Sequence, residues 1–338
     1  MKKILIFSLI SVLFISCGSD SETGGEIIVD PIFIVQTKSV GSIGHESANV
    51  FGAISPSFIS GTVYGIAYGL TPSPTIDGNS TIGANINPAT GGFSSQLTSL
   101  WHNTTYYARA YGTNAEGTFY GDQLVFSTLN KLYTNAGALV DADGNNYATV
   151  LINGKQWMKE NLNVTKYRNG DVIPEVTDMA VWDALTTGAW CYYENDTANG
   201  TVYGKLYNWY AINDTRGLAP TGWHIPSDAE WTGLTTFLGG TSAAGIKMRD
   251  LGSLWSTSAV LATNQAGFSA LPGGYGYLTH TYTPDDQPFS SLGEVAFWWS
   301  ATSANTNAAY SLNVNLNNSV TRGTVLKKTA LSVRCVRY

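Results

Sequence analysis

The residues best suited to contact a ligand gather between Gly239 and Val295, in a stretch rich in glycine and aromatic side chains. Aromatic rings can stack on sugars, while carboxylates accept hydrogen bonds from hydroxyl groups. Loops on a rigid scaffold are also where binding residues concentrate. We therefore predict ligand-binding loops that act through Trp255, Tyr275, Tyr277, Tyr282, Asp285, Asp286 and Phe289. The alternative is that these side chains only pack the loops together.

The pattern of acidic residues and histidines does not indicate a metal site. His280, Asp285 and Asp286 could supply three ligands, but they lack a fixed spacing. Residues 141–145 resemble the start of an EF-hand loop, yet the glycine comes two residues early. Position twelve of that loop is Ile152 instead of a bidentate glutamate. A turn explains this segment better, and we predict no metal and no cofactor.

Catalytic residues are not brought together by any recognisable spacing. No Ser-His-Asp order stands out, and the adjacent Asp285 and Asp286 would face apart on a strand. His45 and His102 stand alone in the sequence. We predict that the protein is not an enzyme.

The N-terminus has the pattern of a secretory signal peptide. Lys2 and Lys3 precede an apolar run, Ile4–Ile15, which is shorter than the roughly 20 residues of a membrane span. Ser16 and Cys17 end this run and resemble a lipobox, so we predict that Cys17 carries a lipid. The alternative is an ordinary signal peptide with an incidental cysteine.

The segment after Cys17 predicts how the protein is displayed. Residues 18–30 are polar and rich in glycine, as in a flexible linker. Asp20 and Glu22 resemble an export signal that sends lipoproteins to the outer face of the outer membrane; the alternative is a plain tether. We predict a surface-exposed protein of the outer membrane, in contact with the membrane through its lipid alone.

Charge and composition exclude one class of partner. The formal net charge is −6 and the isoelectric point is near 5.2, whereas nucleic-acid binding needs a basic surface. Charged residues make up 12% of the chain, about half of the ~25% usual in globular domains. Asparagine, threonine, serine and glycine take their place, as suits an extracellular protein rich in β-structure.

Residues 31–130 carry short strand patterns separated by turn residues, which favours an all-β sandwich. Leu100 followed by Tyr106 resembles the tyrosine corner of such sandwiches. This part of the chain resembles a fibronectin type III-like module, whose simplest role is a stalk. The expected strands span residues 48–54, 62–68, 92–97, 106–111 and 123–128.

Residues 131–338 predict an α+β domain of two helices, an antiparallel sheet and a long loop insert. A hairpin over residues 147–158 turns at Asn153-Gly154. Apolar spacing predicts one helix over 204–213, and a capping box of Ser227 and Glu230 predicts another over 228–238. Alternating residues predict strands over 310–316 and 331–335, the second of which points Cys335 inward.

Six motifs in this second part carry a family resemblance. They are Trp190-Cys191-Tyr192, the segment 203–209, Gly222-Trp223-His224-Ile225-Pro226, the segment 267–274, Trp298-Trp299-Ser300 and the segment 332–336. In this order they resemble the Fibrobacter succinogenes major paralogous domain of bacterial surface proteins. The resemblance covers residues 143–338 and implies a C-type lectin-like fold. It also implies that most of the tryptophans in these motifs are core residues.

Two cysteines remain after Cys17, and their state is open. Export permits a disulfide between Cys191 and Cys335. Domains of the resembled family often carry another cysteine where this chain has Ala219, so the usual partner of Cys335 could be missing. Buried free thiols, which pack like small apolar side chains, are the alternative.

These observations together predict a non-catalytic adhesion or binding lipoprotein, whose head presents loops for a glycan or protein ligand. The loop motifs of calcium-dependent lectins are missing, so calcium-mediated sugar binding is not implied. The alternative is a structural component of a cell-surface complex that has no small ligand.

Lipidation is directly testable. Replacing the acceptor thiol, Cys17→Ala, should abolish incorporation of radiolabelled palmitate, because no other residue offers the thiol that signal processing exposes. Labelling that persists in the Cys17→Ala protein would contradict the anchor, and Cys191→Ala serves as the control that should keep its label.

Overall fold

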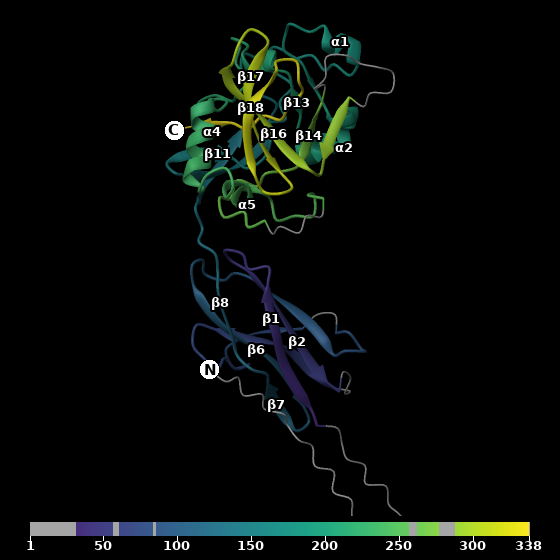
Figure 1. The fold of residues 1–338 in the computed structure, drawn as a ribbon, viewed down its shortest axis with the longest axis vertical. Coiled ribbons are helices and arrows are strands. Elements are labelled where there is room, and N and C mark those ends of the chain that lie inside the picture. The colour runs from purple at the N-terminus through teal and green to yellow at the C-terminus, as the bar shows by residue number, and fades with distance from the viewer. Residues whose placement is uncertain (1–31, 57–60, 84–85, 257–261, 277–287, 338) are drawn as a thin grey trace, which may run out of the picture.

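A computed structural model describes residues 32–56, 61–83, 86–256, 262–276 and 288–337. It consists mostly of β-strands with a few short helices. Figure 1 shows two bodies placed end to end, an N-terminal sandwich in purple to blue and a C-terminal domain in teal to yellow. In the described part of the chain, no helix is both long and apolar enough to cross a membrane.

The N-terminal body is a sandwich of two antiparallel sheets around one apolar core. One sheet has the order β1-β2-β5, and the other has the order β4-β3-β6-β7 with β8 also paired to β6. Core residues from both sheets include Val50, Ile66 and Leu97. The strands are β1 (Ile34–Gly41), β2 (Ala48–Ser55), β3 (Val63–Gly69), β4 (Asn79–Ile82), β5 (Gly92–Leu97), β6 (Thr105–Asn114), β7 (Gly117–Tyr120) and β8 (Leu124–Ser127).

The five strands expected in this body are present, which confirms the fibronectin type III-like sandwich. Its tyrosine corner is also present, because the backbone N–H of Trp101 donates to the Tyr106 hydroxyl at 2.9 Å. Strands β1, β4 and β7 were not predicted. They lie toward the edges of the sheets and bury few side chains, so their apolar alternation is weak.

The C-terminal body contains four small antiparallel sheets and short helices. Its strands are β9 (Thr134–Val140), β10 (Asn146–Ile152), β11 (Lys155–Met158), β12 (Trp190–Cys191), β13 (Leu206–Tyr207), β14 (Gly273–Gly276), β15 (Phe289–Leu292), β16 (Val295–Ser303), β17 (Ala308–Asn315), β18 (Val320–Leu326) and β19 (Val336–Arg337). Its helices are α1 (Met179–Asp183), the 3₁₀ turn η1 (Tyr193–Asn195), α2 (Thr197–Tyr203), α3 (Trp209–Ile212), α4 (Asp228–Phe237) and α5 (Ala244–Met248).

The sheets of this body bring its two ends together. The predicted hairpin is confirmed, with Ile152 opposite Lys155 in β10 and β11. Asn153 and Gly154 both adopt positive φ, which the tight turn requires. At the other end of the domain, β19 pairs with β11, so the last strand closes on the first hairpin.

The helix predicted over residues 204–213 is wrong for its first half. Gly204 has a φ of 76° and ends α2, after which Leu206 and Tyr207 pair with β12 as a short strand. Asn208 then caps α3, since its side chain accepts a hydrogen bond from the Ala211 N–H at 3.1 Å. The apolar spacing therefore corresponds to a helix over only one turn, α3.

The helix predicted over residues 228–238 is confirmed as α4, which Leu238 caps at its C-terminal end. The Ser227 hydroxyl accepts from the Glu230 N–H, and the Glu230 carboxylate accepts from the Ser227 N–H. His224 and Lys155 also lie 2.8 Å and 3.1 Å from the carboxylate of Glu230. Burial raises the pKa of Glu230, but these hydrogen bonds outweigh it and lower the pKa to about 2.

Both thiols are free and buried, which settles the state of the cysteines in this structure. Cys191 packs with Leu206 and Phe289, whereas Cys335 packs in a separate apolar cluster with Leu331 and Val333. Burial raises the pKa of each thiol, so both stay protonated and pack as small apolar side chains.

The last segment of the chain differs most from its sequence pattern. Alternation over residues 331–335 predicted a strand with one buried face, but both faces are buried and only isolated bridges form there. Arg334 has no exposed surface, and burial lowers its pKa to about 9. Its guanidinium donates to the Asn161 side chain and to the carbonyls of Phe268 and Ser269.

The carboxylate of Glu230 gives a pH-dependent prediction. The pKa of Glu230 is lower in the folded chain than its ordinary 4.5, so its stabilisation is complete above pH 4.5 and disappears as the pH falls towards 2. Glu230→Gln should lower the free energy of unfolding by about 1 kcal/mol at pH 7 and by less at pH 3.

Urea unfolding followed by tryptophan fluorescence would measure this loss, because every tryptophan except Trp101 lies in the C-terminal domain. The exposed Glu194→Gln, in the same domain, is the matched control and should change little. If Glu230→Gln lowers the free energy of unfolding equally at pH 7 and pH 3, the lowered pKa of Glu230 is contradicted.

Arg334 gives a second stability prediction. Arg334→Met keeps the aliphatic stem but leaves the buried oxygens of Asn161, Phe268 and Ser269 short of donors. Each such group costs about 1–3 kcal/mol, so the variant should lose about 3 kcal/mol or more in urea unfolding. The exposed Arg337→Met, three residues away, should lose less than about 1 kcal/mol. Equal losses at both positions would count against the role of Arg334.

Candidate ligand-binding sites

A groove of about 700 Å³ lies between the sandwich and the C-terminal domain, at the end that carries α5 in Figure 1. Small-molecule and peptide pockets usually span about 300–1,000 Å³, so the groove is large enough for a ligand. One wall comes from the sandwich and consists of Val40, Gly41, Ser42, Ile43, Gly44, Ser47, Gln96 and Leu129. The other comes from the C-terminal domain and consists of Ile246, Arg249, Asp250, Leu251, Gly252, Trp255, Ser256, Ala262 and Thr263.

The segment after β8 holds these two walls in place. Lys131 forms an ion pair of 2.8 Å with Glu46 of the sandwich. The backbone N–H of Leu132 donates at 2.9 Å to the carbonyl of Gln265, whose side chain donates back to the Asn130 carbonyl. Tyr133 meets His45 edge to face, with 3.4 Å between the hydroxyl and Nε2. These contacts join both bodies through one short stretch of chain.

Arg249 and Trp255 form the floor of the groove on the C-terminal side. The Arg249 guanidinium lies 4.2 Å from the centre of the Trp255 ring and donates to the side chain of Asn318 at 2.6 Å. The Trp255 indole N–H donates to the Ala270 carbonyl at 3.0 Å, and only 7% of the residue is exposed. Burial lowers the pKa of Arg249.

Three of the seven residues predicted to bind ligand are described, and all three rings pack against the protein. Trp255 lines the groove but is covered by Arg249. Tyr275 packs edge to face on Phe297, and Phe289 is buried against Tyr193. The other predicted residues, Tyr277, Tyr282, Asp285 and Asp286, lie outside the described residues, as does His280.

The apolar lining of the groove was missed by the sequence analysis. Leu251 is 54% exposed, and Ile43 of the other body belongs to the same lining. Both residues sit in loops without strong periodicity, so nothing in the sequence pairs them. Only the packing of the two domains brings them to one groove.

Comparison with known proteins now identifies the C-terminal domain. A family model described as the Fibrobacter succinogenes major domain matches residues 150–337. The chain belongs to this family. A comparison with curated proteins found no match.

Solved structures give partial likenesses. Two forms of the sensor domain of the anti-sigma factor RsgI4 from Pseudobacteroides cellulosolvens are 17% and 19% identical to this chain, each with a TM-score of 0.23. They cover 32% and 30% of this chain and 100% and 97% of their own. A fibronectin type III domain of human KIAA0970 protein is 12% identical with a TM-score of 0.21, and covers 28% of this chain and 72% of its own.

The tryptophans of the major domain are scaffold residues, as the resemblance implied. Trp209, Trp223, Trp231, Trp298 and Trp299 are all buried. The indole N–H groups of Trp209, Trp231 and Trp299 donate to backbone carbonyls. Since all five rings are buried, these residues pack the core and do not present a binding face.

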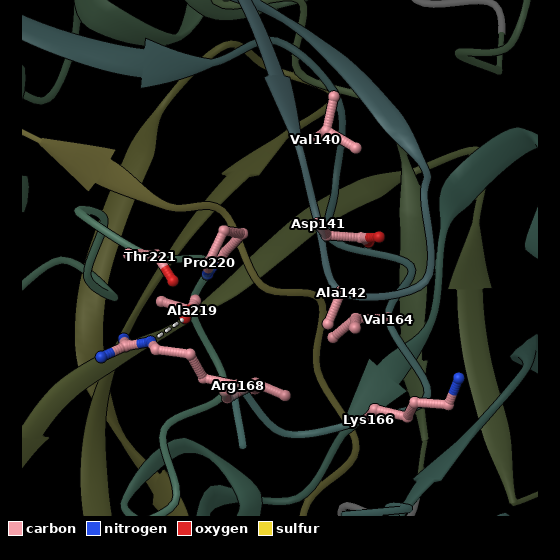
Figure 2. Close-up of a pocket in the computed structure, with 10 residues that line it drawn as sticks. Val140, Asp141, Ala142, Val164, Lys166, Arg168, Ala219, Pro220 and Thr221 are labelled. Carbon is pink, nitrogen blue, oxygen red and sulfur yellow. Dashed lines mark hydrogen bonds between the residues drawn. The ribbon is translucent and has the colours of Figure 1, made fainter. Parts of the chain in front are cut away.

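A second cavity of the major domain, of about 230 Å³, lies where residues 140–142 approach residues 218–221. Figure 2 shows the Arg168 side chain beside Ala219, while the Lys166 amine points away from it. The Nε of Arg168 donates to the Ala219 carbonyl at 3.0 Å, and Lys166 lies 3.4 Å from Asp143. Because the two cations do not converge, this cavity is a weaker candidate than the groove.

The acidic loop over residues 141–145 forms a turn, as predicted. Asp141 accepts hydrogen bonds from the N–H groups of Asp143 and Asn145 and from the Tyr147 hydroxyl. Asp143 accepts from Thr165. The carboxylates therefore serve the fold, and no group of three metal-ligating side chains occurs within the described residues.

Proposed function

We propose that this protein is a non-catalytic lipoprotein of the outer membrane, displayed at the cell surface, that binds a ligand in the groove between its stalk and its head. Cys17 would carry the lipid, and the sandwich would hold the head away from the membrane. The sequence supports this placement, because the signal peptide, the lipobox-like residues and the polar linker precede the sandwich in that order. The membrane would be met through the lipid alone.

The head would have a C-type lectin-like arrangement. The order of a hairpin, two longer helices and a final sheet supports it, as does the return of β19 to β11. The first part of the insert after α4, with α5 and residues 249–256, lies beside the sandwich and lines the groove.

The lining of the groove favours an extended protein segment over a glycan as the ligand. Sugars are bound most strongly by exposed aromatic faces, but the one aromatic ring among the described lining residues, Trp255, is covered by Arg249. Exposed Leu251 and the aliphatic Ile43 suit apolar side chains. Ser42, Ser47 and Gln96 offer hydrogen-bonding groups for a peptide backbone.

A binding screen with the full chain tests this function. The probes are a phage-displayed peptide library and a glycan array. Peptides with apolar side chains should be enriched, and Leu251→Asp should weaken their binding about tenfold, which corresponds to about 1.4 kcal/mol. Val172→Asp is the matched control, because Val172 is 67% exposed and does not line the groove.

The other outcomes separate the competing functions. Selective glycan binding without peptide enrichment would replace the protein ligand by a glycan. An absence of binding to both probe sets, together with a stable partner recovered from surface complexes, would favour the structural role instead. Equal effects of Leu251→Asp and Val172→Asp would place the ligand outside the groove.

A further inference from the structure

Lys205 is a buried lysine whose amine is directed at an asparagine. Only 3% of the residue is exposed, and its Nζ lies 2.7 Å from Oδ1 and 2.8 Å from the backbone oxygen of Asn163. In the described part of the chain, no carboxylate forms an ion pair with this amine. A lysine is seldom buried without such a partner.

Backbone contacts fix the lysine and the asparagine relative to each other. The N–H of Lys205 donates to the Leu162 carbonyl at 3.2 Å, so the two segments run side by side. The N–H of Asn163 donates at 2.9 Å to the hydroxyl of Tyr147, which itself donates to Asp141. Neither residue can move away without breaking these bonds.

The amine is also shielded from water. The ring centres of Trp190 and Tyr192 lie 4.7 Å and 5.0 Å from Nζ. Burial lowers the pKa of the Lys205 amine, partly offset by the charges of Asp143 and Asp141. A larger share of the amine is therefore neutral and nucleophilic than in an exposed lysine.

The distance suits a reaction between the two side chains. With a carbonyl bond of about 1.2 Å, an Nζ that lies 2.7 Å from Oδ1 is within about 4 Å of the amide carbon of Asn163. Reactive approach needs about 3–3.5 Å, and a small rotation of either side chain covers the difference.

We propose that Lys205 and Asn163 join in an intramolecular isopeptide bond. The Nζ–Cγ bond forms and the Cγ–Nδ2 bond breaks, so that the side-chain nitrogen of Asn163 leaves as ammonia with a proton taken from Nζ. The step consumes no oxidant and needs no cofactor, because one amide replaces another.

The bond would cross-link two segments of the head. It ties the segment after β11 to the segment between α2 and β13, and so closes a loop that contains α1 and β12. This cross-link would help to keep the head folded, and it does not depend on any ligand in the groove.

Peptide mapping of the unmodified full chain tests the bond. Trypsin should leave Glu160–Lys166 joined to residues 169–216, since an acylated Lys205 is not cleaved. The joined peptide should weigh less than the sum of its parts by one ammonia. Lys166 is an internal control: it ends the first peptide, its side chain is 43% exposed, and it should be cleaved normally.

Lys205→Arg keeps the charge and the hydrogen-bond donors but forms no such amide, so its digest should give Glu160–Lys166 alone and cleavage after position 205. Recovery of separate, unmodified peptides from the wild-type chain would overturn the proposal. Loss of ammonia from Glu160–Lys166 alone would also overturn it, because that product is a succinimide at Asn161 or Asn163 and contains no cross-link.

Discussion

The head domain depends on one buried charge. Arg334 is fully buried, and no carboxylate of the described residues forms an ion pair with it. Burying an unpaired cation costs several kcal/mol unless hydrogen bonds replace its water. Here the replacement comes from Asn161 and from backbone carbonyls of the insert, with the rings of Phe268 and Trp298 close by. Three distant segments must come together to form these contacts, so the folded head domain depends on the final segment of the chain.

Asn161 belongs to the same buried hydrogen-bond network as Arg334. Its Oδ1 accepts from Arg334 and from the Trp298 indole at 2.8 Å, and its amide nitrogen donates to the Tyr203 carbonyl at 2.9 Å. A single asparagine therefore connects β16, α2 and the end of the chain. Polar networks of this kind stabilise a fold when every member is satisfied, and they leave no room for a ligand in the core.

The buried core offers no binding surface among the described residues of the head. The aromatic residues that look most suited to binding are the same residues that the core uses, and even Trp255 and Phe289 of the insert are buried. The groove beside the sandwich is accessible, and its walls come from both bodies. Lys131, Leu132 and Tyr133 make the contacts that join the two bodies beside that groove.

Local patterns were predictable wherever the signal comes from neighbours in the chain. The capping box at Ser227, the Asn153-Gly154 turn and the tyrosine corner at Tyr106 all appear as expected, since each needs only a few adjacent residues. The helix over 204–213 failed because Gly204 and the pairing with β12 outweighed the apolar spacing. Tertiary contacts such as pairing with a strand can outweigh the helix propensity of a segment.

The sequence by itself determined the order of the two domains, the family of the second and the cap of α4, because these follow from residue types at short spacing. Tertiary structure alone decided that Arg334 is buried, that Cys191 and Cys335 lie in separate clusters, and that Ile43 and Leu251 share a groove. Each of these depends on which distant segments meet, and the free energy of such contacts appears only once the chain has packed.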